Sequence, residues 1–126
     1  MKTILFMISA AALVAAPALV AAADNVSVDG KWRVHDSIAG NESDSDCTFV
    51  QKVAELTGTC KTDQGSVTIA GKVDGKKVKW SYKSEFNGSP LTVVHEGTLS
   101  ADNKITGTAS VPEYSVDGDF TATQAK

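Results

Sequence analysis

Apolar and polar residues alternate along most of the chain, in runs of about six to ten residues separated by Gly, Asn and Asp. A period of two is typical of β-strands that bury one face, and no stretch after Asp24 keeps a helical period beyond one turn. The sequence therefore predicts eight strands, over 31–37, 47–52, 55–62, 66–73, 76–86, 91–100, 104–111 and 117–124.

The predicted connections are mostly short, and Asp74-Gly75 is a typical hairpin turn because such turns need positive φ. Short turns make neighbouring strands antiparallel. We expect an all-β fold, an eight-stranded antiparallel up-and-down barrel, since closure removes exposed sheet edges. A two-sheet sandwich is the alternative, although few connections are long enough for Greek-key crossovers.

One long loop is predicted, over 38–46, and it is acidic and polar. Such a loop could be a lid over a barrel mouth, a weak calcium loop, or a solvated connection. It lacks the spacing and the closing bidentate Glu of an EF-hand loop.

The alternation also sorts side chains into an inner and an outer face. The apolar residues expected to point inward are Trp32, Val34, Phe49, Leu56, Val67, Ile69, Val78, Trp80, Phe86, Leu91, Val93, Leu99, Ile105, Ala109, Phe120 and Ala122. Four polar residues share that face, namely Asp36, Gln51, Tyr82 and His95, and buried polar groups need partners. In one interpretation they lie near a rim and form hydrogen bonds with one another or with water. In the other they line a half-polar cavity, where glycines 58, 71 and 107 leave space.

The first 23 residues have the pattern of a secretory signal peptide. Lys2 precedes an apolar stretch over 4–14, Pro17 breaks it, and Ala21-Ala22-Ala23 is a typical cleavage site. An uncleaved anchor is the alternative reading. Because of this signal peptide, we expect a periplasmic or secreted protein with no membrane contact after cleavage. Residues 24–126 are long enough for one domain and not for two.

Charge and cysteine content narrow the class of partner. The chain carries 12 basic and 15 acidic residues, a formal net charge of −3, which does not favour nucleic acid. Cys47 and Cys60 are its two cysteines, and an oxidising compartment favours a disulfide between them. The pairing would place both sulfurs on one face, in register, and stabilise the fold by about 3 kcal/mol. A reactive pair or a metal site is the minor alternative, and no zinc spacing, other metal motif or cofactor motif is present.

Several short motifs are spread along the chain: Gly30-Lys-Trp32, Leu56-Thr-Gly-Thr-Cys60, Val78-Lys-Trp80, Gly97-Thr-Leu99 and Phe120-Thr-Ala-Thr. Together they resemble the avidin and streptavidin family, which implies an eight-stranded calycin-type barrel with biotin in the open end. The hairpin around Cys47 and Cys60 also resembles that of small exported bacterial proteins, which implies no particular activity.

The resemblance implies a biotin-stacking role for Trp80 and a hydroxyl ligand at Thr62, with Ser66 in place of a loop Asn. Val34, Cys60 and Val93 stand where the family has polar ligands, and no tryptophan follows position 80. The biotin site is therefore not retained.

Three classes of function follow. A binding module would hold a small apolar or aromatic ligand with Trp32, Phe49, Gln51, Trp80, Tyr82 and His95. A cofactor-independent isomerase, lyase or hydrolase would use His95 as general acid or base, with Asp36 orienting it and Tyr82 as second donor. A protein-interaction role would use the outward Thr and Lys strips of the strands.

Overall fold

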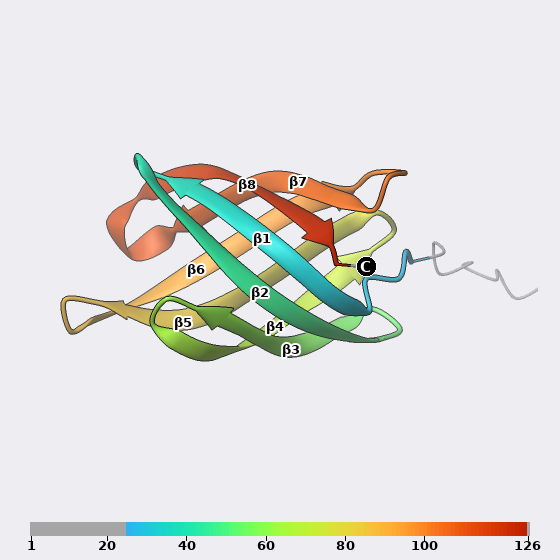
Figure 1. Cartoon of the computed structure of the whole chain (residues 1–126), viewed down its shortest axis with the longest axis horizontal. Coiled ribbons are helices and arrows are strands. Elements are labelled where there is room, and N and C mark those ends of the chain that lie inside the picture. Colours follow the sequence, from blue (N-terminus) through green and yellow to red (C-terminus); the bar gives the residue numbers. More distant parts are fainter. Residues whose placement is uncertain (1–24, 126) are drawn as a thin grey trace, which may run out of the picture.

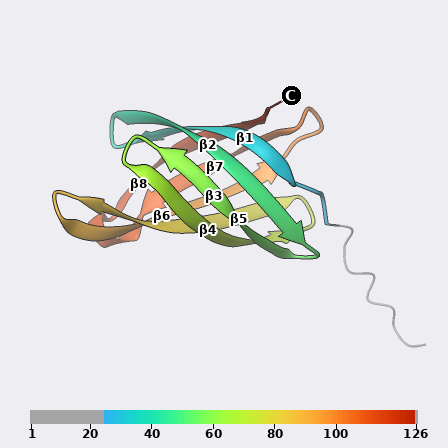
Figure 2. The same cartoon turned by 60° about the horizontal axis from the view of Figure 1, so that its bottom comes forward.

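The computed structural model describes residues 25–125, which form a closed antiparallel barrel of eight strands (Figures 1 and 2). The elements are β1 (Gly30–Ile38), β2 (Asn41–Lys52), β3 (Glu55–Thr62), β4 (Gly65–Asp74), β5 (Lys77–Phe86), β6 (Ser89–Leu99), β7 (Lys104–Val111), the 3₁₀ turn η1 (Pro112–Tyr114) and β8 (Val116–Gln124). Each strand pairs with the next along the chain, and β1 pairs with β8. The predicted up-and-down barrel is confirmed, and the sandwich alternative is wrong because this pairing closes the sheet.

The predicted signal peptide, residues 1–23, lies outside the described residues. Within residues 25–125, no helix has the length and hydropathy needed to cross a bilayer.

The inner face follows the period-two sorting closely. Trp32, Val34, Phe49, Leu56, Ile69, Val78, Trp80, Val93, Ile105, Ala109, Phe120 and Ala122 are all buried. Phe86 is an exception at 58% exposure, because β5 carries it past the edge of the barrel. Alternation gave its face correctly but not its position along the barrel axis.

The loop predicted over 38–46 is wrong. Only Ala39 and Gly40 form the turn, and Asn41–Asp46 is the first half of β2, which at 12 residues is the longest strand. This segment pairs with β1 residue for residue, for example Asp36 with Ser43. Its residues are mostly exposed on both faces, since this part of the strand lies beyond the packed core. A strand without an apolar face shows no hydrophobic alternation, so its polar sequence resembled a loop.

The glycines predicted to leave interior space do not do so. Gly58, Gly71 and Gly107 pair across the sheet with Phe49, Trp80 and Phe120, respectively. A Cβ on Gly107 would overlap the backbone of β6 at the Glu96 carbonyl. These glycines therefore allow close backbone approach, and an aromatic ring stands opposite each one.

The predicted disulfide is confirmed. Cys47 on β2 and Cys60 on β3 are direct cross-strand partners and form the bond on the inner face, where both are buried. Neither described cysteine is left as a free thiol. The bond is compatible with an oxidising, extracytoplasmic environment.

Candidate functional site

One end of the barrel is closed by the residues that precede β1. Val26 N donates to Gly75 O, and Val28 N donates to Gln51 Oε1 at 2.8 Å. Gln51 Nε2 in turn donates to the carbonyls of Val26 and Val53, both at 2.9 Å. No described segment is bonded across the opposite end in this way. That end, formed by the β1–β2, β3–β4 and β5–β6 turns and η1, is called the mouth below (left in Figure 1).

The interior between the two ends is filled by aromatic rings. Trp80 stacks on His95, with ring centroids 4.7 Å apart and planes 10° from parallel. Phe49 lies 5.0 Å from Trp80, and Phe120 meets both Trp80 and His95 edge-on, at 5.2 and 4.9 Å. Tyr82 lies on the mouth side of His95, at 6.0 Å. The imidazole and the indole thus share the interior as predicted, but they fill it themselves.

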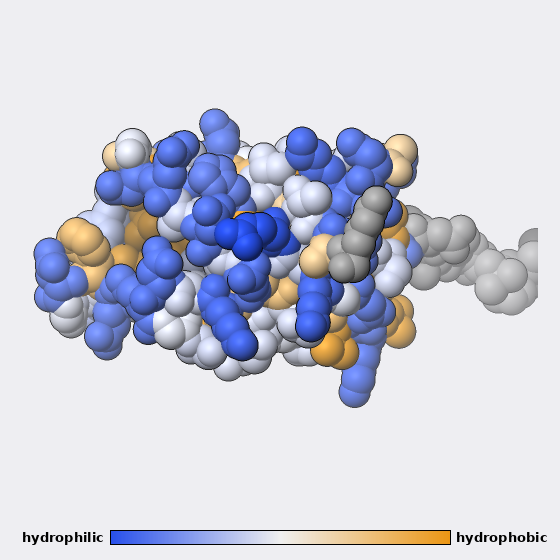
Figure 3. Space-filling model, viewed as in Figure 1, coloured by the Kyte–Doolittle hydropathy of each residue, from blue (hydrophilic) through white to orange (hydrophobic). Residues whose placement is uncertain are grey.

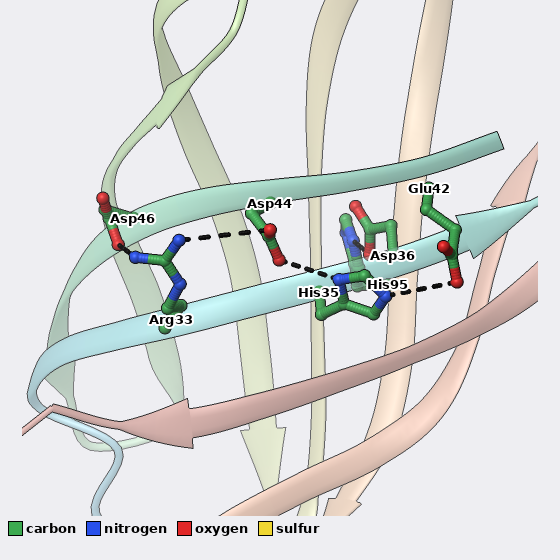
Figure 4. Close-up of polar contacts among 7 residues, drawn as sticks. All are labelled: Arg33, His35, Asp36, Glu42, Asp44, Asp46 and His95. Carbon is green, nitrogen blue, oxygen red and sulfur yellow. Dashed lines mark hydrogen bonds and ion pairs between the residues drawn. The ribbon is translucent and has the colours of Figure 1, made fainter.

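A buried hydrogen bond between His95 and Asp36 spans the interior of the barrel. His95 Nε2, on β6, donates to Asp36 Oδ1, on β1, at 2.8 Å, and their side chains are only 2% and 6% exposed. Because β7 and β8 separate the two strands in the sheet, the bond crosses the lumen (Figure 4). His95 Nδ1 and Trp80 Nε1 are buried without a hydrogen-bond partner in the described structure. A buried pair of this kind fixes side-chain positions, and breaking it leaves an uncompensated polar group.

Tyr82 completes the layer nearest the mouth. Its burial, and secondarily the negative charge of Asp36, raise the pKa of the Tyr82 phenol to about 12. The phenol is therefore neutral across the physiological range.

A polar pocket of about 190 Å³ opens above Asp36 and Tyr82. Its acidic lining residues are Asp36, Asp44, Asp63 and Glu85, and its neutral polar ones are Ser43, Ser45, Thr62, Gln64 and Ser84. Phe86 and Leu91 complete the wall. The pocket thus combines carboxylates and hydroxyl groups with apolar and aromatic surface, and no basic side chain lines it.

An apolar pocket of about 400 Å³ lies beside it at the same mouth. Its apolar lining residues are Ile38, Ala39, Phe86, Leu91, Val93, Val111, Tyr114 and Val116, and Asn41 and Ser43 are its polar ones. Three residues, Ser43, Phe86 and Leu91, belong to both pockets, so the two are adjoining parts of one opening. The space-filling view shows apolar surface recessed between hydrophilic side chains at this end (Figure 3).

The residues predicted to bind a ligand divide by depth. Tyr82 and Asp36 line the polar pocket, whereas Trp80 and His95 line neither mouth pocket and are each 1% exposed. Trp32 and Phe49 are core residues at 1% and 2% exposure, and Trp32 Nε1 donates to the carbonyl of Val28. Gln51 belongs to the closed end. The space at the mouth therefore lies one layer further out than the predicted cavity beside Trp80 and His95.

A row of ion pairs runs along the outer face of β1 and β2, beside the mouth (Figure 4). Arg33 lies 3.5 Å from Asp46 and 4.0 Å from Asp44, between guanidinium nitrogens and carboxylate oxygens. His35 Nδ1 donates to Asp44 Oδ1 at 2.7 Å, and its Nε2 lies 3.6 Å from Glu42 Oε1. The bond to Asp44 is the main cause that raises the pKa of His35.

These carboxylates do not form the calcium loop considered for this segment, because they point outward along a strand and face cations. Among residues 25–125, no group of three or more His, Cys, Asp or Glu side chains is placed to hold a metal ion.

Several residues of the mouth were not predicted from the sequence. Ser43 and Ser45 fall in the segment predicted as a loop, and Tyr114 and Val116 lie between the predicted strands 104–111 and 117–124. Val111 ends a predicted strand but is not among the residues expected to point inward. The signal that was available is the apolar pair Val111 and Val116 on either side of Pro112.

No family model matches the chain, and the search of curated proteins finds no match.

Proposed function

We propose that this protein is exported to the periplasm or secreted, and that the mouth of its barrel binds a small amphipathic molecule. The observation that carries the proposal is the meeting of a polar and an apolar pocket at Ser43, Phe86 and Leu91. A ligand seated there would place its polar group over Asp36 and Tyr82 and its apolar part against Val93. Concave sites with mostly apolar walls and a few convergent polar groups are typical of small-molecule binding.

The walls of this opening are preformed. Paired strands hold Asp36, Ser43, Leu91 and Val93 in place, and the disulfide joins the strands β2 and β3 below the rim. Preformed walls lower the ordering cost of binding, so even a small ligand can gain from burial of its apolar surface, by about 25 cal/mol per Å².

The resemblance to the avidin family supports the location of the site at the open end of a barrel, but not biotin as the ligand. Val34, Cys60 and Trp80 stand at family biotin positions, and each is 1% exposed within the packed interior. A ligand of this barrel would therefore sit nearer the rim.

Catalysis by Asp36, Tyr82 and His95 is the weaker candidate. The three residues do lie together, with His95 bonded to Asp36 at 2.8 Å and Tyr82 stacked 6.0 Å away. However, the imidazole does not line either mouth pocket, so it is not presented to a molecule bound there. The position of the imidazole suits a role in which His95 holds the Asp36 carboxylate in place.

Amide NMR titration tests the proposal with three probes that share a phenylethyl-type body: phenethylamine, phenylethanol and phenylpropanoate. We expect at least one of them to shift mouth amides saturably, around Gly40, Gln64 and Gly88, while amides at the closed end stay unchanged. Ser43→Phe fills the shared wall of both pockets and should abolish the shifts. Thr48→Phe, on the exposed outer face of the same strand, should leave them intact. Absence of saturable shifts with all three probes would overturn the proposal.

A further inference from the structure

The polar pocket has an unbalanced charge. Four acidic residues line it, Asp36, Asp44, Asp63 and Glu85, and no Lys, Arg or His does. Asp36 is the buried one of the four, whereas the Asp44 carboxylate faces outward, toward Arg33 and His35. The nearby cations Arg33 and Lys61 line an adjoining groove on the outer side of β2 and β3, which shares Ser43, Asp44, Thr62 and Asp63 with the polar pocket. Glu42 and Asp46 line that groove too, so acidic residues outnumber basic ones over the two spaces together. A ligand entering the polar pocket therefore meets a negative field that favours cations and repels anions.

Asp36 adds a specific acceptor to this field. Asp36 is 4% exposed, and its Oδ1 accepts the hydrogen bond from His95. Its Oδ2 has no hydrogen bond to any described residue. The side chain nevertheless lines the pocket. A largely buried carboxylate oxygen is stabilised when a donor reaches it, and charged N–H donors give the stronger, shorter bonds.

Two aromatic residues, Tyr82 and Phe86, line the same pocket as Asp36, and ring faces attract organic cations within about 6 Å of their centroids. The adjoining apolar pocket offers walls such as Val93 and Val111 to the uncharged part of the molecule. Carboxylate, ring faces and apolar walls are together the components of a site for an organic ammonium ion.

We infer that the ligand of the mouth is a small amphipathic amine, whose ammonium group binds Asp36 and whose alkyl or aryl group fills the apolar pocket. This inference rests on the proposed function, and it adds the ligand class and names Asp36 as the residue that determines specificity. The hydrogen bond from His95 and the pairing of β1 with β2 and β8 hold that carboxylate at the base of the polar pocket.

The test compares the same three probes by their dissociation constants from NMR titration at pH 7 and low salt. We expect phenethylamine to bind at least tenfold more tightly than neutral phenylethanol, and anionic phenylpropanoate to bind most weakly. Added salt should weaken the amine and leave phenylethanol unchanged, because only the former gains from charge.

The variant Asp36→Asn keeps an acceptor for His95 Nε2 and removes the charge. It should reduce amine affinity to that of phenylethanol, whose own affinity should not change. The matched control is Asp46→Asn, which removes a carboxylate on the outer face, away from the polar pocket, and should preserve the amine preference.

The outcomes separate the two proposals. If phenylethanol or phenylpropanoate binds the mouth as tightly as phenethylamine, the amine inference is wrong and the mouth remains a binding site. If Asp36→Asn retains the full amine preference, Asp36 is not the determinant and the inference is equally wrong. If none of the three probes binds, both proposals fail.

Discussion

The buried pair of Asp36 and His95 makes a sharp prediction about stability. Substituting His95→Phe keeps a ring that can stack on Trp80 but removes the main partner of a carboxylate whose side chain is 6% exposed. Loss of one partner of a buried pair costs about 3–5 kcal/mol. Asp36→Leu leaves the buried Nε2–H of His95 without its acceptor, which costs about 1–3 kcal/mol. The double variant leaves no unpaired polar group from this pair, so we expect its stability to lie within about 1 kcal/mol of the parent.

Urea unfolding followed by tryptophan fluorescence measures all four proteins in non-reducing buffer. For a small domain, the free energy of unfolding falls by about 1–3 kcal/mol per M urea, so a loss of about 3 kcal/mol moves the unfolding midpoint by about 1 M or more and is well resolved. The control cycle uses the exposed pair His35 and Asp44, through His35→Phe and Asp44→Leu, where solvent screening should leave far weaker coupling. Additive losses in the buried cycle, or single variants as stable as the parent, would refute the reasoning.

Three further predictions follow from the structure. The hydrogen bond to Asp44 raises the pKa of His35, so this pair stabilises the fold fully below pH 6.5 and loses that effect as the pH rises through the pKa of the folded state. His35→Gln should flatten this part of the curve of stability against pH, and an unchanged curve would contradict the assignment. The double variant Cys47→Ala/Cys60→Ala should lower the free energy of unfolding by about 3 kcal/mol in urea titrations, and equal stability would show that the bond does not constrain the unfolded chain. Ultraviolet titration should show a phenol ionisation near pH 12 that Tyr82→Phe removes, and stability should fall above pH 10 because the unfolded chain releases this proton earlier. If the ionisation that Tyr82→Phe removes lies at pH 10 instead, the burial of Tyr82 does not raise its pKa.

Most of the fold could be predicted because seven of the strands carry apolar residues at every second position over much of their length. In an antiparallel sheet with one buried face, that period fixes both the strand and the direction of each side chain. It placed His95 and Trp80 inside correctly. The pairing of Cys47 with Cys60 followed from the same sorting, since both lie on the inner face of one hairpin.

The rim could not be predicted in the same way. The first half of β2 is polar on both faces, and what holds it is its pairing with β1, including contacts of Arg33 and His35 with the acids opposite. Those contacts depend on a register that a single strand does not reveal. Alternation also gives the face of a side chain but not its depth, so the direct stacking of Trp80 on His95 was not visible in the sequence.

A crystal structure of the protein with bromophenethylamine tests the central claim most directly, because bromine is located by its anomalous signal. The account predicts a bromine peak in the apolar pocket, near Val93 and Val111, with the ammonium nitrogen about 3 Å from a carboxylate oxygen of Asp36. A bromine peak at the closed end, on the outer face of the strands, or nowhere at saturating concentration would contradict it.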